Sequence, residues 1–169
     1  MYMKKANATE LLIFIIGTEL AGTLSALLSG SFLPFYLKLN KPALSPPGWV
    51  FPVVWTLLYA LMGISAYLIK SSDSDRKKIK SALSIYIIQL SLNFMWSIVF
   101  FRFRSIGSAA AVIVLLLAAA VYMTLRFYRI RPSAAYLNLP YIAWIAFCRI
   151  SQLRDTVFKL SLTSRNQKS

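Results

Sequence analysis

Histidine is absent from this 169-residue sequence, and Cys148 is its only cysteine. A disulfide cannot form within the chain, and zinc, iron–sulfur and histidine-ligated haem sites lack their usual ligands. Acidic residues are also few, with five Asp and Glu against nineteen Lys and Arg. We therefore expect no metal centre, and no acid–base pair, nucleophile or metal site supports ordinary hydrolysis or group transfer.

Charge of either sign is scarce. Charged residues make up 14% of the chain and hydrophobic residues 58%, with a mean hydropathy of +0.62. An ordinary soluble domain is about 25% charged and about 45–50% apolar, so most of this surface cannot face water, and the composition predicts an integral membrane protein. The net charge of +14 does not indicate nucleic acid, because Lys and Arg fall in short runs between apolar blocks, as they do in membrane proteins.

The apolar blocks are long enough to cross a bilayer. Crossing ~30 Å of hydrocarbon takes ~20 residues of helix. The expected spans are Glu10–Ser29, Gly48–Ile69, Ile79–Phe101, Ser105–Leu125 and a fifth from Pro132 through Trp144. The first is interpreted as a retained span, since no convincing cleavage site follows its apolar stretch. Short loops favour antiparallel neighbours, so the predicted fold class is an all-α integral membrane bundle of five transmembrane helices.

The distribution of basic residues predicts an orientation. Ten Lys and Arg lie at the N-terminus and in the second and fourth loops, and four lie on the opposite side before the C-terminal tail. The positive-inside tendency then places the N-terminus in the cytoplasm, in a bacterial cell membrane. The tail holds five further Lys and Arg, which would raise the count on the opposite side from four to nine and remove the difference between the sides. The predicted orientation therefore depends on how the tail is interpreted.

Small residues recur along the first span at four-residue spacing. One stripe holds Gly17, Ala21, Ser25 and Ser29, and a neighbouring stripe holds Gly22, Ala26 and Gly30. Such stripes let helix backbones approach closely in lipid. They would serve packing within the bundle, which we favour, or a homodimer.

Glu19 lies near the middle of the same span. A carboxylate within the membrane is a functional candidate. The alternative is a carboxyl group hydrogen-bonded to Thr18, Thr23 or another helix, and the sequence leaves both interpretations open.

A proline-rich, aromatic segment precedes the second span. Four prolines fall between Pro42 and Pro52, so the segment cannot form a long helix or join a central strand. Trp49, Phe51 and Trp55 lie where such a loop would meet lipid or cover a cavity between helices.

Polar and aromatic side chains share one face of the third span. Gln89, Asn93 and Trp96 follow at intervals of four and three residues. Two amides are costly against lipid, so they should point into the bundle. They would either join helices or form the polar base of an apolar ligand pocket. Aromatic residues at membrane ends are usually interfacial anchors, but Trp55, Trp96 and Trp144 lie inside spans, where an indole N–H needs a partner.

Taken in order, these residues resemble the TspO/MBR family of tryptophan-rich sensory proteins and translocator proteins. The resemblance extends from Phe35 to Phe147 and rests on Tyr36, Lys41-Pro42, Pro46-Pro47, Trp49-Val50-Phe51, Val54-Trp55-Thr56, Leu58-Tyr59, Met62-Gly63, Gln89, Leu92-Asn93, Trp96-Ser97, Phe100-Phe101, Pro140-Tyr141 and Trp144. It implies a five-helix membrane bundle, often a homodimer, that binds porphyrins and, in some members, sterols or benzodiazepine-type drugs.

The same resemblance implies a ligand site and no required cofactor. Protoporphyrin IX or a haem-like tetrapyrrole would lie beneath the loop in contact with Tyr36, Pro46, Pro47, Trp49, Phe51, Trp55, Gln89, Asn93, Trp96, Trp144 and Phe147. A flat macrocycle stacks well on indole rings, and basic side chains at the rim could meet its carboxylates. The expected partners are therefore a porphyrin or another flat apolar molecule, the bilayer and a second copy of the chain.

Two other functions remain open. Bacterial relatives are credited with light- or oxygen-dependent breakdown of bound porphyrin, for which Trp55 and Trp144 would exchange electrons with the macrocycle. The third interpretation is a regulatory partner protein that contacts itself or another membrane protein through the first span.

The chain departs from the family after residue 147, so we divide it into a membrane domain (1–147) and an atypical tail (148–169). The family continues as an apolar helix resembling Phe-Ala-Ala-Tyr-Leu-Asn-Phe-Ala-Ile, whereas this chain has Arg149, Arg154 and Asp155. Codons exist for which the loss of one T near Phe147 restores the apolar ending. Our hypothesis is a one-base frameshift that replaced the end of the fifth helix, and resequencing the gene tests it.

Overall fold

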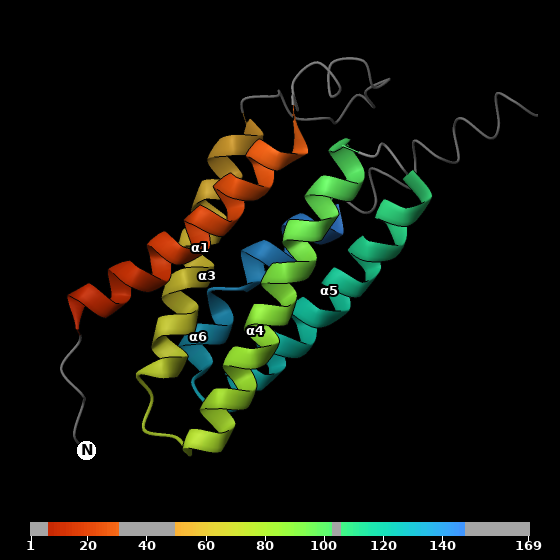
Figure 1. Cartoon of the computed structure of the whole chain (residues 1–169). Helices are drawn as coiled ribbons and strands as arrows, with labels where there is room; N and C mark the ends of the chain where they lie inside the picture. The colour runs from red at the N-terminus through yellow and green to blue at the C-terminus, as the bar shows by residue number, and fades with distance from the viewer. Residues whose placement is uncertain (1–6, 31–49, 103–105, 148–169) are drawn as a thin grey trace, which may run out of the picture.

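The computed structural model describes residues 7–30, 50–102 and 106–147, and every regular element in these ranges is helical. Figure 1 shows α1 (Ala8–Ser29), α3 (Val50–Lys70), α4 (Arg76–Ser97), a π-helical turn (Ile98–Arg102), α5 (Ile106–Tyr128) and α6 (Pro132–Tyr136), followed by helical residues 139–147. The prediction of an all-α membrane bundle is confirmed. The tail 148–169 and the loop 31–49 lie outside the described residues.

The helices form a bundle of roughly parallel and antiparallel rods (Figure 1). Helix α1 packs on α3, and α4 packs on α5. Helix α6 contacts both α3 and α5, so the start of the fifth span joins the two helix pairs. Helix α1 also contacts α4 and the π-helical turn, so α1, α3 and α4 pack against one another.

Three helical segments are long and apolar enough to cross a membrane: Ala8–Ser29, Pro52–Lys70 and Ala111–Tyr128. Helix α4 begins earlier than the expected Ile79, at Arg76, because Asp75 caps it and its Oδ1 accepts a hydrogen bond of 3.0 Å from the Lys77 amide. Its first turns are therefore charged, and its apolar length continues into the π-helical turn.

The fifth span is present but is not one continuous helix. Helix α6 ends at Tyr136, residues 137–138 form a turn, and helix resumes at residue 139. Pro140 explains the break, since it has no N–H and its ring would clash with the carbonyl of Tyr136. Asn138 lies in this turn, and its Nδ2 donates a hydrogen bond of 2.7 Å to Ser65 Oγ of α3.

Helices α1 and α3 approach each other at two glycines. A Cβ atom on Gly63 would lie 2.8 Å from Ile15 Cα and 2.9 Å from the Phe14 carbonyl oxygen. A Cβ atom on Gly22 would lie 2.2 Å from the Tyr59 ring. At Gly63 only glycine fits without movement of the α1 backbone, and at Gly22 a larger residue would displace the Tyr59 ring.

Small residues of α1 therefore pack within the bundle, but not along the expected stripes. The buried positions are Ser25 and Ser29 of the first stripe, Gly22 of the second, and Thr18, which belongs to neither. Gly17 and Ala26 are exposed, and a Cβ atom on Gly17 would meet nothing within 4 Å. The difference arises because the 3.6-residue turn makes a straight four-residue stripe drift around the helix.

A hydrogen-bonded pair links α1 to α4. Thr18 Oγ1 donates to the Phe14 carbonyl, so the Tyr86 hydroxyl donates to Thr18 Oγ1 across 2.6 Å. Because the Thr18 hydroxyl donates to Phe14, it does not donate to Glu19, which was one of the alternatives for that carboxyl group. Glu19 is half-buried beside the backbone of Ala60 in α3.

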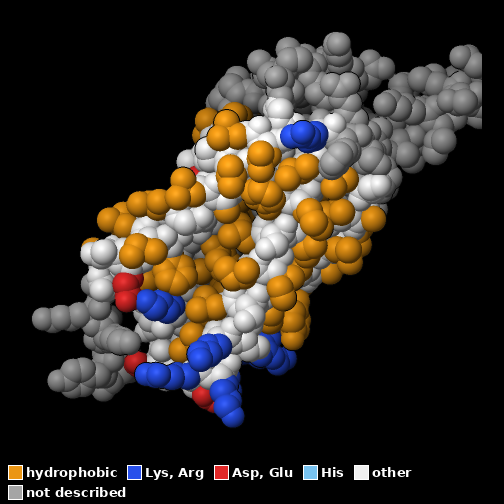
Figure 2. All heavy atoms as spheres, viewed as in Figure 1, with side chains coloured by type: hydrophobic (Ala, Val, Ile, Leu, Met, Phe, Trp, Pro, Cys, Tyr) orange, Lys and Arg blue, Asp and Glu red, His pale blue; other side chains and the backbone are white. Residues whose placement is uncertain are grey.

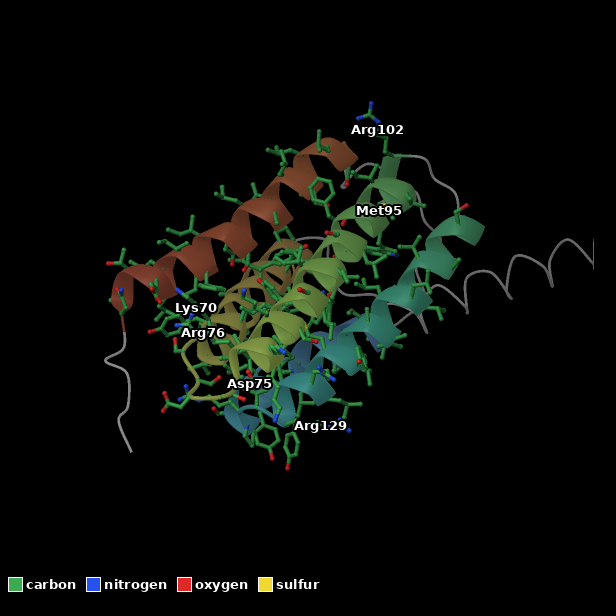
Figure 3. All side chains as sticks on the ribbon, turned by 60° about the horizontal axis from the view of Figure 1, so that its bottom comes forward. Lys70, Asp75, Arg76, Met95, Arg102 and Arg129 are labelled. Atoms are coloured by element: carbon green, nitrogen blue, oxygen red, sulfur yellow. The ribbon has the colours of Figure 1, made fainter. Side chains whose placement is uncertain are left out.

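The outer surface has an apolar middle and a basic end (Figure 2). The outward face of α1 alone exposes Leu12, Ile13, Ile16, Leu20, Leu24 and Leu27. Figure 3 places Lys70, Arg76 and Arg129 at one end of the bundle and Arg102 at the other. An apolar belt between polar ends is the surface that a bilayer requires.

Candidate ligand site

The inner face of α4 carries two completely buried amides. Gln89 and Asn93 have no exposed surface, and Trp96 is 6% exposed. The prediction that these three residues share a face turned into the bundle is confirmed.

Tyr141 is the residue that both amides contact. Its side chain is also fully buried. Gln89 Nε2 donates to Tyr141 Oη, and Asn93 Nδ2 donates to the same oxygen at 3.0 Å. The hydroxyl thereby joins α4 to helical residues 139–147.

The other end of each amide has no partner among the described residues. Gln89 Oε1 and Asn93 Oδ1 are buried oxygens without a hydrogen-bond donor. A buried polar group left in this state costs ~1–3 kcal/mol. Whichever way each amide is turned, one of its polar ends has no hydrogen-bond partner among the described residues.

Aromatic rings from three helices surround the amides. The Trp55 ring centroid lies 5.5 Å from that of Tyr59, 6.4 Å from that of Trp96 and 6.4 Å from that of Tyr141. Aromatic pairs attract at these separations. We name Trp55, Tyr59, Gln89, Asn93, Trp96 and Tyr141 the amide–aromatic cluster.

Exposure increases from the amides toward the edge of the cluster. Trp55 is half-buried, in contrast to Gln89. Trp144, three residues after Tyr141, is also half-buried, and its ring lies 5.7 Å from that of Phe147. Phe147 is 38% exposed. The arrangement has a buried polar centre and a partly exposed aromatic rim.

The predicted site residues divide into those that the structure places and those that it does not describe. Trp55, Gln89, Asn93 and Trp96 lie together in the cluster, and Trp144 with Phe147 follows on the next turn after Tyr141. The remaining predicted residues, Tyr36, Pro46, Pro47, Trp49 and the side chain of Phe51, lie outside the described residues.

Two members of the cluster were not among the predicted site residues. Tyr59 lies four residues after Trp55, and Tyr141 lies three residues before Trp144. Helical spacing from the predicted tryptophans would have placed both on the same faces. The signal was therefore present in the sequence.

The cluster offers rings for stacking and uncharged polar groups for hydrogen bonds. Its side chains supply indole and phenol rings, a hydroxyl group and amides, none of them ionised at neutral pH. In the described ranges, no three His, Cys, Asp or Glu side chains lie close enough to hold a metal ion.

Comparison with known proteins gives consistent matches over most of the chain. The sequence profile of the TspO/MBR family matches residues 12–153. The translocator protein of Homo sapiens is 39% identical over 124 residues, which cover 73% of each chain. A tryptophan-rich sensory protein of Cereibacter sphaeroides is 32% identical over 133 residues, covering 79% of this chain and 80% of its own. The tryptophan-rich protein TspO of Archaeoglobus fulgidus is 34% identical over 162 residues, covering 95% and 99%.

Proposed function

Because this chain belongs to the TspO/MBR family of membrane proteins, we propose that it binds porphyrins at the amide–aromatic cluster, as a translocator or sensor of such ligands. Protoporphyrin IX or a haem-like tetrapyrrole is the proposed ligand, and sterols or benzodiazepine-type drugs are further candidates. The observation that carries the proposal is a set of buried, incompletely hydrogen-bonded amides next to a half-buried tryptophan.

The aromatic part of the cluster supports a flat ligand. Trp55 is half-buried while contacting Tyr59, Trp96 and Tyr141, so it can present ring surface to a molecule at the edge of the cluster. Stacking on such rings favours planar, conjugated molecules over branched aliphatic ones. Trp144 and Phe147 extend the same aromatic rim.

The polar part supports binding over packing alone. Amides that only join helices would have both ends hydrogen-bonded, since most buried polar atoms are. Gln89 Oε1 and Asn93 Oδ1 instead have no donor among the described residues. A ligand N–H or O–H group that reached these oxygens would satisfy them and would gain specificity from the hydrogen bond.

The test is a protoporphyrin IX titration of the purified protein, followed by the shift of the porphyrin absorbance band. Trp55→Ala should weaken binding about tenfold, because it removes one of the two indole rings of the rim. The control is Tyr136→Ala, which removes an exposed ring that packs on Tyr128 away from the cluster. Equal affinities for wild type, Trp55→Ala and Trp144→Ala would reject the site.

A second candidate function is light- and oxygen-dependent breakdown of the bound porphyrin. The contacts of Trp55 with Trp96 and Tyr141 favour it, because adjacent oxidisable rings can pass an electron to or from an excited ligand. Trp55→Phe should then retain porphyrin binding but lose product formation under illumination in air. Bleaching at the rate of porphyrin in detergent alone would argue against catalysis.

The proposed location is the cell membrane, with the N-terminus in the cytoplasm. The concentration of Lys and Arg at the end of the bundle that holds Lys70, Arg76 and Arg129 supports this orientation (Figure 3). Proteolysis of the 71–75 turn from the cytoplasmic side only would agree with it.

We also propose a homodimer. The outward apolar face of α1, where Gly17 leaves open space, is the surface that supports it. Crosslinking in the membrane that is unaffected by Gly17→Trp would argue against that face.

A further inference from the structure

The end of the bundle that holds the 71–75 turn carries far more positive than negative charge (Figures 2 and 3). Helix α4 begins with Arg76, Lys77 and Lys78, and α5 ends with Arg126 and Arg129 near its last turn. The one ion pair within the described ranges joins Lys70 Nζ to Glu10 Oε2 at 2.7 Å, on α3 and α1. The described cations on α4 and α5 form no ion pair of this kind, and the nearby carboxylates in the chain, Asp73 and Asp75, are outnumbered by them.

One of these cations is held in place at the contact between α4 and α5. Arg126 Nη2 donates to Ser81 Oγ at 3.0 Å, and its guanidinium carbon lies 6.0 Å from the centroid of the Tyr122 ring. These contacts fix the side chain but use one of its five N–H groups in a described hydrogen bond. The remaining donors are available to a phosphate group, which a guanidinium can bind with two parallel hydrogen bonds.

Two more cations lie on the same helix faces. Lys77 precedes Ser81 by four residues, and Arg129 follows Arg126 by three, so each stands one turn from the Ser81–Arg126 bond. Both side chains are exposed. We name Lys77, Ser81, Tyr122, Arg126 and Arg129 the basic junction.

Toward the middle of the bundle, the same two faces become apolar. Ile88 lies two turns beyond Ser81 on α4 and is 57% exposed, and Leu115 lies two turns before Tyr122 on α5 and is 58% exposed. Leu125, next to Arg126, is 57% exposed. The basic junction thus lies next to a strip of exposed apolar side chains. A molecule with an anionic head group and hydrocarbon chains is complementary to this combination.

We propose that the basic junction is a binding site for an anionic phospholipid, with the phosphate on Arg126, Lys77 and Arg129 and the acyl chains along Ile88 and Leu115. A soluble phosphate compound would match the cations but would leave the apolar strip unused. The site lies on the outer surface of α4 and α5 and does not depend on the proposed porphyrin function.

The experiment measures lipid binding to the detergent-purified full chain by native mass spectrometry. Phosphatidylglycerol is compared with phosphatidylcholine of the same acyl chains. Wild type should retain phosphatidylglycerol preferentially. Arg126→Gln, which can still bond to Ser81, should lower the phosphatidylglycerol affinity about fivefold, and Lys77→Gln should have the same direction of effect. Arg126→Lys should recover most of the affinity.

The matched control is Arg102→Gln, which removes an equal charge at the opposite end of the bundle (Figure 3). It should leave phosphatidylglycerol binding unchanged. An equal loss in Arg102→Gln and Arg126→Gln would mean diffuse attraction and would overturn the proposal. Two other results would also overturn it: equal retention of the two lipids, or protection against thermal unfolding by inorganic phosphate as strong as that by phosphatidylglycerol.

Discussion

Helix α3 takes part in two contacts of opposite character. Toward α1 it presents Gly63, and the two backbones meet with no side chain between them. Toward α4 and residues 139–147 it presents Trp55, whose ring packs against those of Trp96 and Tyr141. Tyr59 lies between the two contacts, with its ring beside that of Trp55 and close to Gly22 of α1. Close approach of the backbones thus marks the first contact, and packing of large rings marks the second.

The difference bears on which contact is available for function. At Gly63 the α1–α3 contact has no room for a Cβ atom, so a larger side chain there must move a helix. The amide–aromatic cluster includes two oxygens with no described donor and a half-buried tryptophan. One helix thus has a face that fixes the bundle and a face that can respond to a ligand.

The largest expected effect comes from Gly63→Ala. The added methyl group would lie 2.8 Å from Ile15 Cα, and backbone cannot rotate away as a side chain can. We expect a loss of stability of about 3 kcal/mol, at the upper end for overpacking, measured as thermal unfolding in detergent. Gly17→Ala is the control, since its methyl group meets nothing within 4 Å, and it should be neutral or slightly stabilising. Equal unfolding temperatures for the two variants would contradict the described approach of the helices.

A smaller effect, on binding more than on stability, is expected from Asn93→Leu. The change removes an oxygen that has no described donor, and Tyr141 keeps its contact with Gln89. Porphyrin affinity should fall about fivefold to tenfold, the value of one hydrogen bond of ~1–1.4 kcal/mol, with little change in unfolding temperature. The opposite pattern, lost stability with intact binding, would show that the amide only joins helices.

The smallest effect is expected from Tyr86→Phe, which removes the hydroxyl that donates to Thr18 across the α1–α4 contact. Hydrogen bonds between membrane helices contribute ~0.6 kcal/mol on average, so the unfolding temperature should fall slightly and porphyrin affinity should not change. Thr18→Val in the same background should add almost nothing further, because the pair is already broken. A full additional loss would show that the two side chains act independently.

Much of this arrangement follows from sequence patterns. The span boundaries are close to the observed helices because long apolar runs between charged turns leave little choice. The shared face of Gln89, Asn93 and Trp96 follows from helical spacing, and their burial follows from the cost of amides in lipid. Both properties depend on neighbouring residues in the chain or on the surrounding lipid, so a single sequence is enough to predict them.

Contacts between helices could not be predicted from such patterns. That Tyr141 is the partner of both amides depends on the rotation of residues 139–147, which the break at 137–138 sets. The exclusion of a side chain at Gly63 depends on its position relative to Ile15, 48 residues earlier in the chain. The favoured role of the small residues of α1, packing within the bundle, holds for Gly22, Ser25 and Ser29, whereas Gly17 and Ala26 are exposed. Which of them are buried depends on how α1 crosses its neighbours.

The π-helical turn at Ile98–Arg102 has a consequence for how the length of this helix can vary. A π turn holds about one residue more than an α turn, so the deletion of one residue there would restore an ordinary helix. Gln89 and Asn93 precede the turn and would keep their positions. Arg102, which donates to the Leu28 carbonyl at 3.3 Å, would keep nearly the same direction about the helix axis, because the extra residue is taken up within one wider turn. Homologues that lack one residue here should therefore share both the ligand face of α4 and the attachment of its end to α1.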